Sequence, residues 1–263
     1  MALSPTPTSL LTMRLRILVA LVIREMCARF GRSWGGYIWA IAEPTGGILL
    51  LSVAFSFIAH TPPIGTSFVF FYASGIVPFM MYTAIANSTM FAIRGNRGLL
   101  TYPIVTALDT LVARAILDAL THSMIALILF PLILTWEGIN PNITPGALAL
   151  AFLMVVSLGV GVGTLNCVIV GFFPTWQNIW SLLNRPLFVI SGILFSFGSV
   201  PTRLRDVLAY NPLAQAVEQT RHGLYGSVTP GFVSIPYVFG ISLAFFVIGA
   251  YLMRRNEGFL LQP

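Results

Sequence analysis

Long apolar stretches alternate with short polar or Gly- and Pro-rich segments along most of this chain of 263 residues. A helix that crosses a lipid bilayer needs about 20 mostly apolar residues. Six stretches satisfy this requirement, at residues 34–59, 68–93, 112–135, 147–172, 177–198 and 232–253. The segments between them, such as HTPPIGTS and WEGINPNITPG, carry strong turn signals. The pattern predicts an all-α polytopic membrane protein with six transmembrane helices within residues 34–263.

Residues 1–33 follow a different pattern and form a separate cytoplasmic segment in this interpretation. Four charged residues fall within about 60° of one another on a helix: Arg14, Glu25, Arg29 and Arg32. Most of the other residues are Leu, Ile, Val or Ala. We expect an amphipathic helix over 10–32 that lies along the cytoplasmic face of the membrane, with a simple membrane anchor as the alternative. The segment lacks a small-residue cleavage site, so a cleavable signal peptide is not expected.

Residues 199–231 contain signals for two short helices and not for a span. The first helix would begin with Thr202 as its cap. Asn211 and Pro212 are typical of the N-cap and first position of the second helix, and Gly223 of its end. About eleven residues rise roughly 16 Å, half of the hydrocarbon thickness. We expect a short re-entrant helix pair on the periplasmic side before the last span, with an ordinary ordered loop as the alternative.

Composition agrees with a membrane protein and excludes several kinds of chemistry. The chain is 57% hydrophobic and 8% charged, whereas soluble domains average about 25% charged residues. All 14 basic residues are Arg, so a Walker A phosphate loop and lysine-based catalysis are excluded. Two Cys and three His are scattered without metal-ligand spacing. No catalytic residue, metal site or cofactor is therefore expected in this chain.

The arginines also indicate the orientation in the membrane, because cytoplasmic segments carry an excess of basic residues. Nine of them fall in the two terminal segments and between the second and third spans: Arg14, Arg16, Arg24, Arg29, Arg32, Arg94, Arg97, Arg254 and Arg255. We therefore expect both termini in the cytoplasm. Four charged residues of the periplasmic segment would shape the exit of the channel: Arg203, Arg205, Glu218 and Arg221.

Several charged residues fall inside or near the expected spans. Arg114 and Asp118 stand four residues apart and are expected to form a structural ion pair within the bundle. Arg185 is a candidate to meet either an anionic substrate or a carboxylate of a neighbouring helix. Glu43 precedes Pro44 in the first span, where it would either hold a kink or reach toward the headgroups.

Aromatic residues gather at the starts of the first and fifth spans. They are Trp34, Tyr37, Trp39, Trp176 and Trp180. Such rings serve either as interfacial anchors or as platforms for sugar rings, whose CH-rich faces are apolar. Composition does not separate these two roles. We take the five aromatic residues, with Glu43 and Arg185, as candidates for the substrate path.

Four strings resemble permease subunits of bacterial ABC exporters for polysaccharides, in the same order along nearly the whole chain: REMCARFGRSWGGYIWAIAEP (24–44), NRGLLTYPIVTALDTLVAR (96–114), RPLFVISGILF (185–195) and NPLAQAVEQTR (211–221). The likeness is greater to capsular-polysaccharide permeases than to those for O-antigen or teichoic acid. It implies a homodimer of this chain bound to a cytoplasmic ABC ATPase dimer, on which ATP and Mg bind. It also implies a lipid-linked, often acidic, polysaccharide as cargo, with periplasmic and outer-membrane partners and no nucleic acid.

The segment 94–106 resembles the cytoplasmic coupling region of these permeases. It is short, punctuated by Gly, and carries apolar side chains that fit a groove of an ATPase. The expected coupling residues are Arg94, Asn96, Leu99, Leu100 and Tyr102. Closure of the ATPase would move this loop and shift the spans between closed and open arrangements.

We therefore expect an inner-membrane permease, not itself an enzyme, that exports lipid-linked acidic capsular polysaccharide from the cytoplasm to the periplasm. Permeases for O-antigen, teichoic acid, lipids or drugs share this plan and remain alternatives. An intramembrane enzyme acting on lipid-linked sugars is an alternative of another class. It would need a convergent set of acids, histidines or metal ligands near one interface, and the sequence indicates none.

Overall fold

The computed structural model describes residues 7–30, 35–101, 104–226 and 231–260. All regular structure within these ranges is helical. The helices are α1 (Pro7–Phe30), α2 (Gly35–Ser56), α3 (Phe68–Met90), α4 (Ala92–Leu100), α5 (Ala107–Glu137), α6 (Pro145–Phe172), α7 (Trp176–Ile190), η1 (Phe197–Ser199, a 3-10 turn), α8 (Thr202–Ala209), α9 (Pro212–Tyr225), α10 (Ile235–Arg255) and α11 (Glu257–Leu260).

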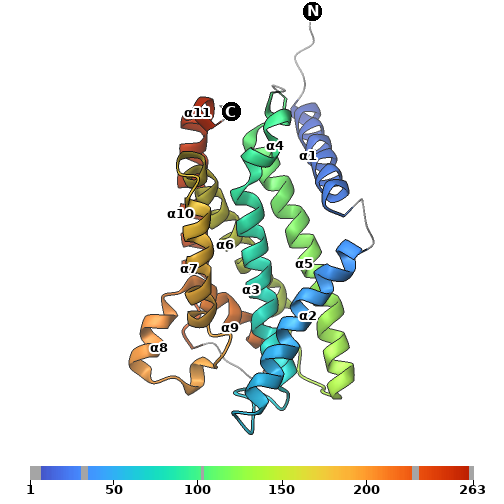
Figure 1. Cartoon of the computed structure of the whole chain (residues 1–263), viewed down its shortest axis with the longest axis vertical. Coiled ribbons are helices and arrows are strands. Elements are labelled where there is room, and N and C mark those ends of the chain that lie inside the picture. The colour runs from blue at the N-terminus through green and yellow to red at the C-terminus, as the bar shows by residue number, and fades with distance from the viewer. Residues whose placement is uncertain (1–6, 31–34, 102–103, 227–230, 261–263) are drawn as a thin grey trace, which may run out of the picture.

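The long helices run side by side and give the molecule two ends (Figure 1). α1, α4 and α11 lie at one end, which we call the α4 end, and α8 and α9 lie at the other, the α9 end. The core surrounds α3, which packs against α5, α6 and α9. Phe71 and Ile85 of α3 and Met154 of α6 are fully buried members of one continuous apolar core.

Five helices are long and apolar enough to cross a membrane: Ile38–Ser56 within α2, and α3, α5, α6 and α10. They coincide with five of the expected spans. The span expected over 177–198 is shorter, because α7 ends at Ile190 after 15 residues. Such a helix rises about 22 Å, against a hydrocarbon core of about 30 Å. Gly192 follows the C-cap residue and has a φ of 75°, a left-handed conformation that does not continue the helix. Glycine adopts it without strain, and a side chain there would also collide with Phe197.

α1 forms close to the expected limits, and four of its five charged side chains contact the bundle. It lies beside the half of α5 nearest the α4 end (Figure 1). Arg14, Glu25 and Arg29 each pair with a charged residue of α5. Leu15 and Val19 face outward and are exposed. The charged face therefore serves helix packing, and the apolar face forms the outer surface of the helix.

The helix pair expected before the last span is present, and its second member is buried. α8 begins at Thr202 after Pro201. α9 begins as the sequence predicts, with the Asn211 side chain accepting a hydrogen bond from the Leu213 N–H at 3.0 Å and Pro212 in the first turn. Eleven of the fourteen residues of α9 are buried, because the helix packs against α3 and α6.

The end of α9 differs from the expectation. Gly223 lies inside the helix and not just past it, and α9 continues to Tyr225. A Cβ at Gly223 would lie 2.7 Å from the backbone nitrogen of Leu148, so this glycine permits the close approach of α9 to α6. Gly226, with a φ of 65°, ends the helix in the left-handed conformation.

Arg221 is fully buried at the centre of the α9 end. Its guanidinium donates to the carbonyls of Phe195 at 3.2 Å and Ile193 at 3.4 Å, and to Oγ of Ser74 at 3.4 Å. Its Nη1 lies 3.5 Å from a carboxylate oxygen of Glu218. Burial raises the pKa of the Glu218 carboxyl and lowers the pKa of the Arg221 guanidinium, and each charge opposes the shift of the other. Arg221 therefore fastens the segment after α7 to α9 and α3.

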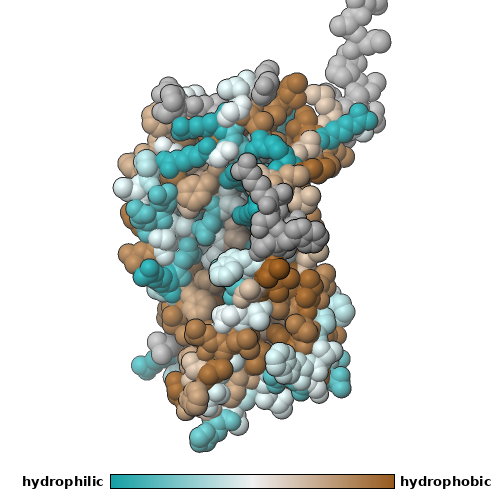
Figure 2. Space-filling view, turned by 45° about the vertical axis from the view of Figure 1, so that its right-hand side comes forward, coloured by the Kyte–Doolittle hydropathy of each residue, from teal (hydrophilic) through white to brown (hydrophobic). Residues whose placement is uncertain are grey.

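Apolar side chains also cover much of the outside of the bundle. On the face shown in Figure 2, hydrophobic residues form a broad area over the lower half, and hydrophilic residues gather toward the α4 end. Leu50 of α2 and Leu127 of α5 are among the exposed apolar side chains. Soluble monomers rarely expose large contiguous apolar areas, so this surface fits contact with lipid or with another protein.

Candidate functional site: a charged network at the α4 end

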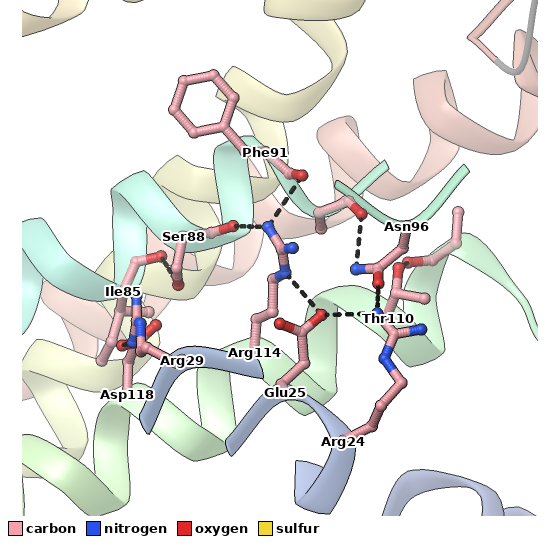
Figure 3. A network of polar contacts seen from close by, with 12 residues as sticks. Arg24, Glu25, Arg29, Ile85, Ser88, Phe91, Asn96, Thr110, Arg114 and Asp118 are labelled. Atoms are coloured by element: carbon pink, nitrogen blue, oxygen red, sulfur yellow. Dashed lines mark hydrogen bonds and ion pairs between the residues drawn. The ribbon is translucent and has the colours of Figure 1, made fainter. Parts of the chain in front are cut away.

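Charged and polar residues of α1, α3, α4 and α5 meet at the α4 end (Figure 3). The local sequence fixes the start of α5 there, because Thr106 and Asp109 form a reciprocal capping box. Asp109 also pairs with Arg14 of α1, with 3.0 Å between Oδ2 and Nη1. The first turn of α5 is thus held both by its own cap and by α1.

Arg114 of α5 is the centre of this network. Its Nε lies 3.2 Å from Oε1 of Glu25 in α1, and its Nη1 donates to the carbonyls of Ser88 at 3.2 Å and Phe91 at 3.0 Å. These carbonyls lie at the end of α3, where backbone acceptors lack helical partners and the helix dipole is negative. One half-buried guanidinium therefore joins α1, α3 and α5.

Asn96 ties α4 to the same network. It is buried and interrupts α4 with a φ of −126° and a ψ of 16°. Its amide nitrogen donates to the carbonyl of Ala92 at 3.1 Å, and its side-chain oxygen accepts from Arg24. Arg24 also lies 3.5 Å from Glu25. The kink of α4 is thus bonded to α1, which Figure 3 shows as one connected set of contacts.

Arg114 and Asp118 pair with residues of α1. The ion pair between the two, which their spacing predicts, is not found among the described contacts. Arg114 pairs with Glu25, and Asp118 pairs with Arg29. Glu25 and Arg29 stand four residues apart, as do Arg114 and Asp118, with the opposite order of charges. Each of these charges on α1 therefore faces an opposite charge on α5. Sequence reasoning missed these partners in α1, although the matched spacing was a signal for them.

Two cavities lie beside the network and share Arg29, Asn87 and Asp118 as lining residues. The smaller one has a volume of about 310 Å³ and also contacts Arg114. The larger one has a volume of about 410 Å³ and extends between α2, α3 and α5. A polar space therefore follows the contact between α1 and α5.

The larger cavity contains two of the substrate-path candidates. Trp39 and Glu43 of α2 line it together with Thr121 and His122 of α5. An aromatic ring beside carboxylate and hydroxyl groups suits a sugar, which presents apolar faces and hydroxyl edges. The Nδ1 of His122 lies 3.0 Å from the carbonyl oxygen of Asp118 in its own helix. Among the described residues, no group of three or more His, Cys, Asp or Glu is placed to hold a metal ion.

The substrate-path candidates of α7 lie on another side of α3. Trp176 donates from Nε1 to Asn166 Oδ1 at 3.0 Å, and Trp180 donates to Asn87 Oδ1 at 3.1 Å. Asn87 thus links an α7 aromatic ring to the larger cavity. Arg185 is exposed and makes no hydrogen bond or ion pair within the described part of the chain. Trp34 lies outside the described residues, and Tyr37 is described only as a backbone position of α2.

The expected coupling residues divide into two groups. Arg94 and Asn96 are turned inward, and Arg94 donates to the carbonyl of Val170 in α6 at 2.9 Å. Leu99 and Leu100 are half-buried, and Leu100 packs on a small apolar cluster at this end. Tyr102 lies outside the described residues.

The residues expected at the exit fall into two groups, two on or near α8 and two buried in α9. Arg203 is exposed on α8, and the guanidinium carbon of Arg205 lies 5.8 Å from the ring centroid of Phe232. Glu218 and Arg221 are buried inside the α9 end, as described above. These two therefore act within the fold of this chain, while Arg203 faces its surroundings.

Known proteins resemble this chain over most of its length. The model of the ABC-2 type transporter family matches residues 17–225. The polysialic acid transport protein KpsM of Escherichia coli is 35% identical, over 90% of this chain and 92% of its own. The capsule polysaccharide export inner-membrane protein BexB of Haemophilus influenzae is 24% identical, over 91% of each chain. The O-antigen export system permease protein RfbA of Klebsiella pneumoniae is 21% identical, over 91% of each chain.

Alanine at two glycines of α4 tests whether Arg114 fixes this helix. A Cβ at Gly95 would collide with the Arg114 guanidinium, whereas a Cβ at Gly98 meets no atom within 4 Å. Both changes gain helix propensity of about 1 kcal/mol. We expect Gly98→Ala to keep or raise the free energy of unfolding in detergent. Gly95→Ala should lower it by about 1.5–3 kcal/mol relative to Gly98→Ala, since charged hydrogen bonds are displaced. Equal stability of the two variants would contradict this role of Arg114.

Proposed function

We propose, since the chain belongs to the ABC-2 type transporter family, that it is the inner-membrane permease of an ATP-driven exporter of lipid-linked, acidic capsular polysaccharide. The observation that carries this proposal is the match over nearly the full length to a polysialic acid transport protein. Polysialic acid is an acidic polymer, and a capsule export protein and an O-antigen permease match over similar lengths. Because this chain has no Lys for a phosphate loop, ATP and Mg would bind on a separate ATPase dimer.

In this proposal the α4 end faces the cytoplasm. The nine arginines expected on the inside belong to α1, α4, the end of α10 and the segments beside them. Figure 1 places these three helix regions at the same end of the bundle. The positive-inside rule then supports cytoplasmic N- and C-termini and a periplasmic α9 end. The apolar outer face of α1, with Leu15 and Val19, would rest against the cytoplasmic leaflet.

The charged network supplies a physical route by which movements of the ATPase would reach the membrane-spanning helices. An ATPase that presses on the exposed side of α4, at Arg97 and Gly98, would displace the kink at Asn96. That displacement reaches α1 through Arg24, and it reaches α5 through Arg114. Because these contacts are charged and partly buried, the helices would move together and not one at a time. A homodimer would enclose the path of the polymer between two such bundles.

The polar cavities and α7 would contact the cargo. Trp39 lines a cavity suited to a sugar, by stacking of its ring and by hydrogen bonds to Glu43 and Thr121. Arg185 has no partner within the described part of this chain, so it is available to an anionic polymer or to a second copy. α8 would stand beside the exit with Arg203 exposed, where periplasmic and outer-membrane partners receive the polymer.

An intramembrane enzyme is the second candidate, because the larger cavity brings Glu43, Asp118 and His122 together. Two contacts argue against it. Asp118 is neutralised by Arg29, and His122 donates from Nδ1 to a carbonyl of its own helix. O-antigen, teichoic acid, lipids and drugs are alternative cargoes of the same permease plan.

A strain that lacks this chain, and receives it back on a plasmid, tests export and coupling together. We expect the polymer to remain inside the cells without the chain and to return to the surface with it. Gly98→Asp should lower surface polymer at least about tenfold, since an unpaired carboxylate buried in the ATPase contact costs several kcal/mol. Gly98→Ala is the matched control and should export normally. A sugar-specific antibody, applied to intact and to opened cells, measures both pools.

The possible outcomes separate the parts of the proposal. Normal surface polymer with Gly98→Asp would remove this side of α4 from coupling. Unchanged polymer location without the chain would contradict export. Surface polymer of altered length or composition would instead favour the enzyme.

Single cysteines test the orientation. In a variant with Cys27→Ser and Cys167→Ser, Tyr210→Cys places a thiol on the exposed side of the α9 end. It should react with a membrane-impermeant maleimide added from the periplasm. Arg97→Cys, on the exposed side of α4, should react only after the inner membrane is opened. The reverse pattern would contradict the proposed topology.

A further inference from the structure

Two opposite charges on apolar helices lack partners in the described part of the chain. Glu43 of α2 and Arg185 of α7 are both exposed, and neither makes a hydrogen bond or an ion pair there. His122 lines the same cavity as Glu43, but the two side chains form no ion pair. A charge within the hydrocarbon of a membrane is costly unless an opposite charge or water meets it. Both residues therefore require a partner from outside this chain.

The other carboxylates are either paired or lie at the ends of the bundle. Four of the eight acidic residues in the sequence pair with an arginine: Glu25, Asp109, Asp118 and Glu218. Three others end α5, belong to α8 or begin α11: Glu137, Asp206 and Glu257. Among the described residues, Glu43 is therefore the only unpaired carboxylate between the two ends.

α3 shows the depth of Glu43, because α2 and α3 run antiparallel and contact one another (Figure 1). The ring centroids of Phe55 in α2 and Tyr72 in α3 lie 5.4 Å apart. Glu43 stands twelve residues before Phe55, and Ala84 stands twelve residues after Tyr72. Both helices rise by the same amount per residue, so Glu43 is level with Ala84. The two residues also line the same cavity.

α3 shows the depth of Arg185 as well, because α7 lies against its other side (Figure 1). Trp180 of α7 donates to Asn87 of α3 at 3.1 Å, and a ring contact joins the two helices eight residues further along each of them. Arg185 stands five residues after Trp180 and is therefore level with Tyr82. Tyr82 and Ala84 are two residues apart along α3, or about 3 Å. The two unpaired charges thus lie at nearly the same depth.

The helices that carry these charges are largely uncovered. No residue of α7 is buried by the described part of the chain. The buried residues described in α2 recur every four positions along one line: Pro44, Ile48 and Ser52. Glu43 lies off this line, beside Gly46 and Gly47, where an added Cβ would meet no atom within 4 Å. Small residues of this kind permit another helix to approach closely within a membrane.

We propose that Glu43 of one copy of this chain forms an ion pair with Arg185 of a second copy, with α2 of each copy against α7 of the other. The inference rests on the homodimer of the proposed function and names the charges that hold it together. A two-fold axis along the membrane normal keeps every residue at its depth, so residues at one depth can meet across it. The pair then occurs twice, once on each side of the axis.

Other partners satisfy only one of the two charges. An anionic polymer would pair with Arg185 and leave Glu43 without a cation. Lipid headgroups are within reach of a long arginine side chain more readily than of a glutamate. Glu43 stands five residues inside the apolar part of α2, about 8 Å from its start at Ile38. A second copy satisfies both charges at once, and it adds a guanidinium to the cavity beside Glu43.

Exchange of the two charges between separately tagged full chains tests this pairing. Glu43→Arg alone brings two arginines together at each contact, and Arg185→Glu alone brings two carboxylates together. Each variant should dimerise with itself at least about tenfold less than the unchanged chain. Co-expression of the two variants restores both ion pairs, so these chains should copurify through the two tags as well as unchanged chains do.

A chain with both substitutions supplies the matched control. It should dimerise with itself, because both ion pairs form with their charges exchanged. It should copurify with the unchanged chain at least about tenfold less, because each contact again brings like charges together. A pair within one chain predicts the reverse, with no rescue between the single variants and free mixing of the double variant with the unchanged chain.

A cysteine pair tests the same contact without adding a charge. In chains with Cys27→Ser and Cys167→Ser, Glu43→Cys in one copy and Arg185→Cys in the other should form a disulfide when a mild oxidant is added to membranes. Leu243→Cys, exposed on α10, should not form one with Glu43→Cys. The second ion pair of such a dimer is intact, so the substitutions leave the assembly in place.

The outcomes separate this inference from the proposed function. An unchanged chain that is monomeric would contradict the homodimer itself. Dimers of the unchanged chain that persist in both single variants would overturn the ion pair alone, as would the absence of the disulfide between positions 43 and 185. Normal dimers of Arg185→Glu that no longer export polymer would also overturn it, and would assign Arg185 to the cargo.

Discussion

A guanidinium lying among helix ends must have its charge and its N–H donors satisfied, and the α4 end is arranged around that requirement at Arg114. Arg114 pairs with a carboxylate of α1 and donates hydrogen bonds to two carbonyls at the end of α3. The carboxylate of Glu25 lies beside Arg24, and Arg24 bonds to Asn96 in α4. Removing any member would leave a polar group without its partner. This dependence is what makes four separate helices one mechanical unit.

The α9 end is held together by the same kind of interaction, an arginine bonded to backbone carbonyls. Arg221 donates to the carbonyls of Ile193 and Phe195, which follow the early end of α7. In both places one arginine binds two backbone carbonyls where a helix has stopped. The planar fork of Arg serves two acceptors at once, which the single ammonium of Lys does with less geometric control. Both ends of the bundle therefore depend on arginine in a chain that contains no Lys.

The hydrophobic pattern predicted most of the fold, because span length and turn residues are local properties. It overestimated the length of α7, because the apolar run continues through residues 193–195 although the backbone leaves the helix before Gly192, whose φ is 75°. The spacing of charges predicted an ion pair between Arg114 and Asp118, because i,i+4 neighbours along one helix are visible in the sequence. The residues of an opposing helix are not visible in this way. Glu25 was identified as charged, but its partner depends on how α1 packs. The hydrogen bond from Trp176 to Asn166 could not be predicted, since it depends on how α7 packs against α6.

The central claim is that Arg114 ties the start of α4, at the carbonyl of its N-cap residue Phe91, to α1 and α5. Hydrogen–deuterium exchange of the amides of α4, in the full chain with Arg114→Met, tests it most directly. Arg97→Met, an arginine exposed on α4 itself, is the control. The account predicts exchange about tenfold to a hundredfold faster over residues 92–100 in Arg114→Met, because charged hydrogen bonds worth about 1.5–3 kcal/mol are lost. Unchanged exchange of α4 in Arg114→Met, or equal acceleration in both variants, would contradict it.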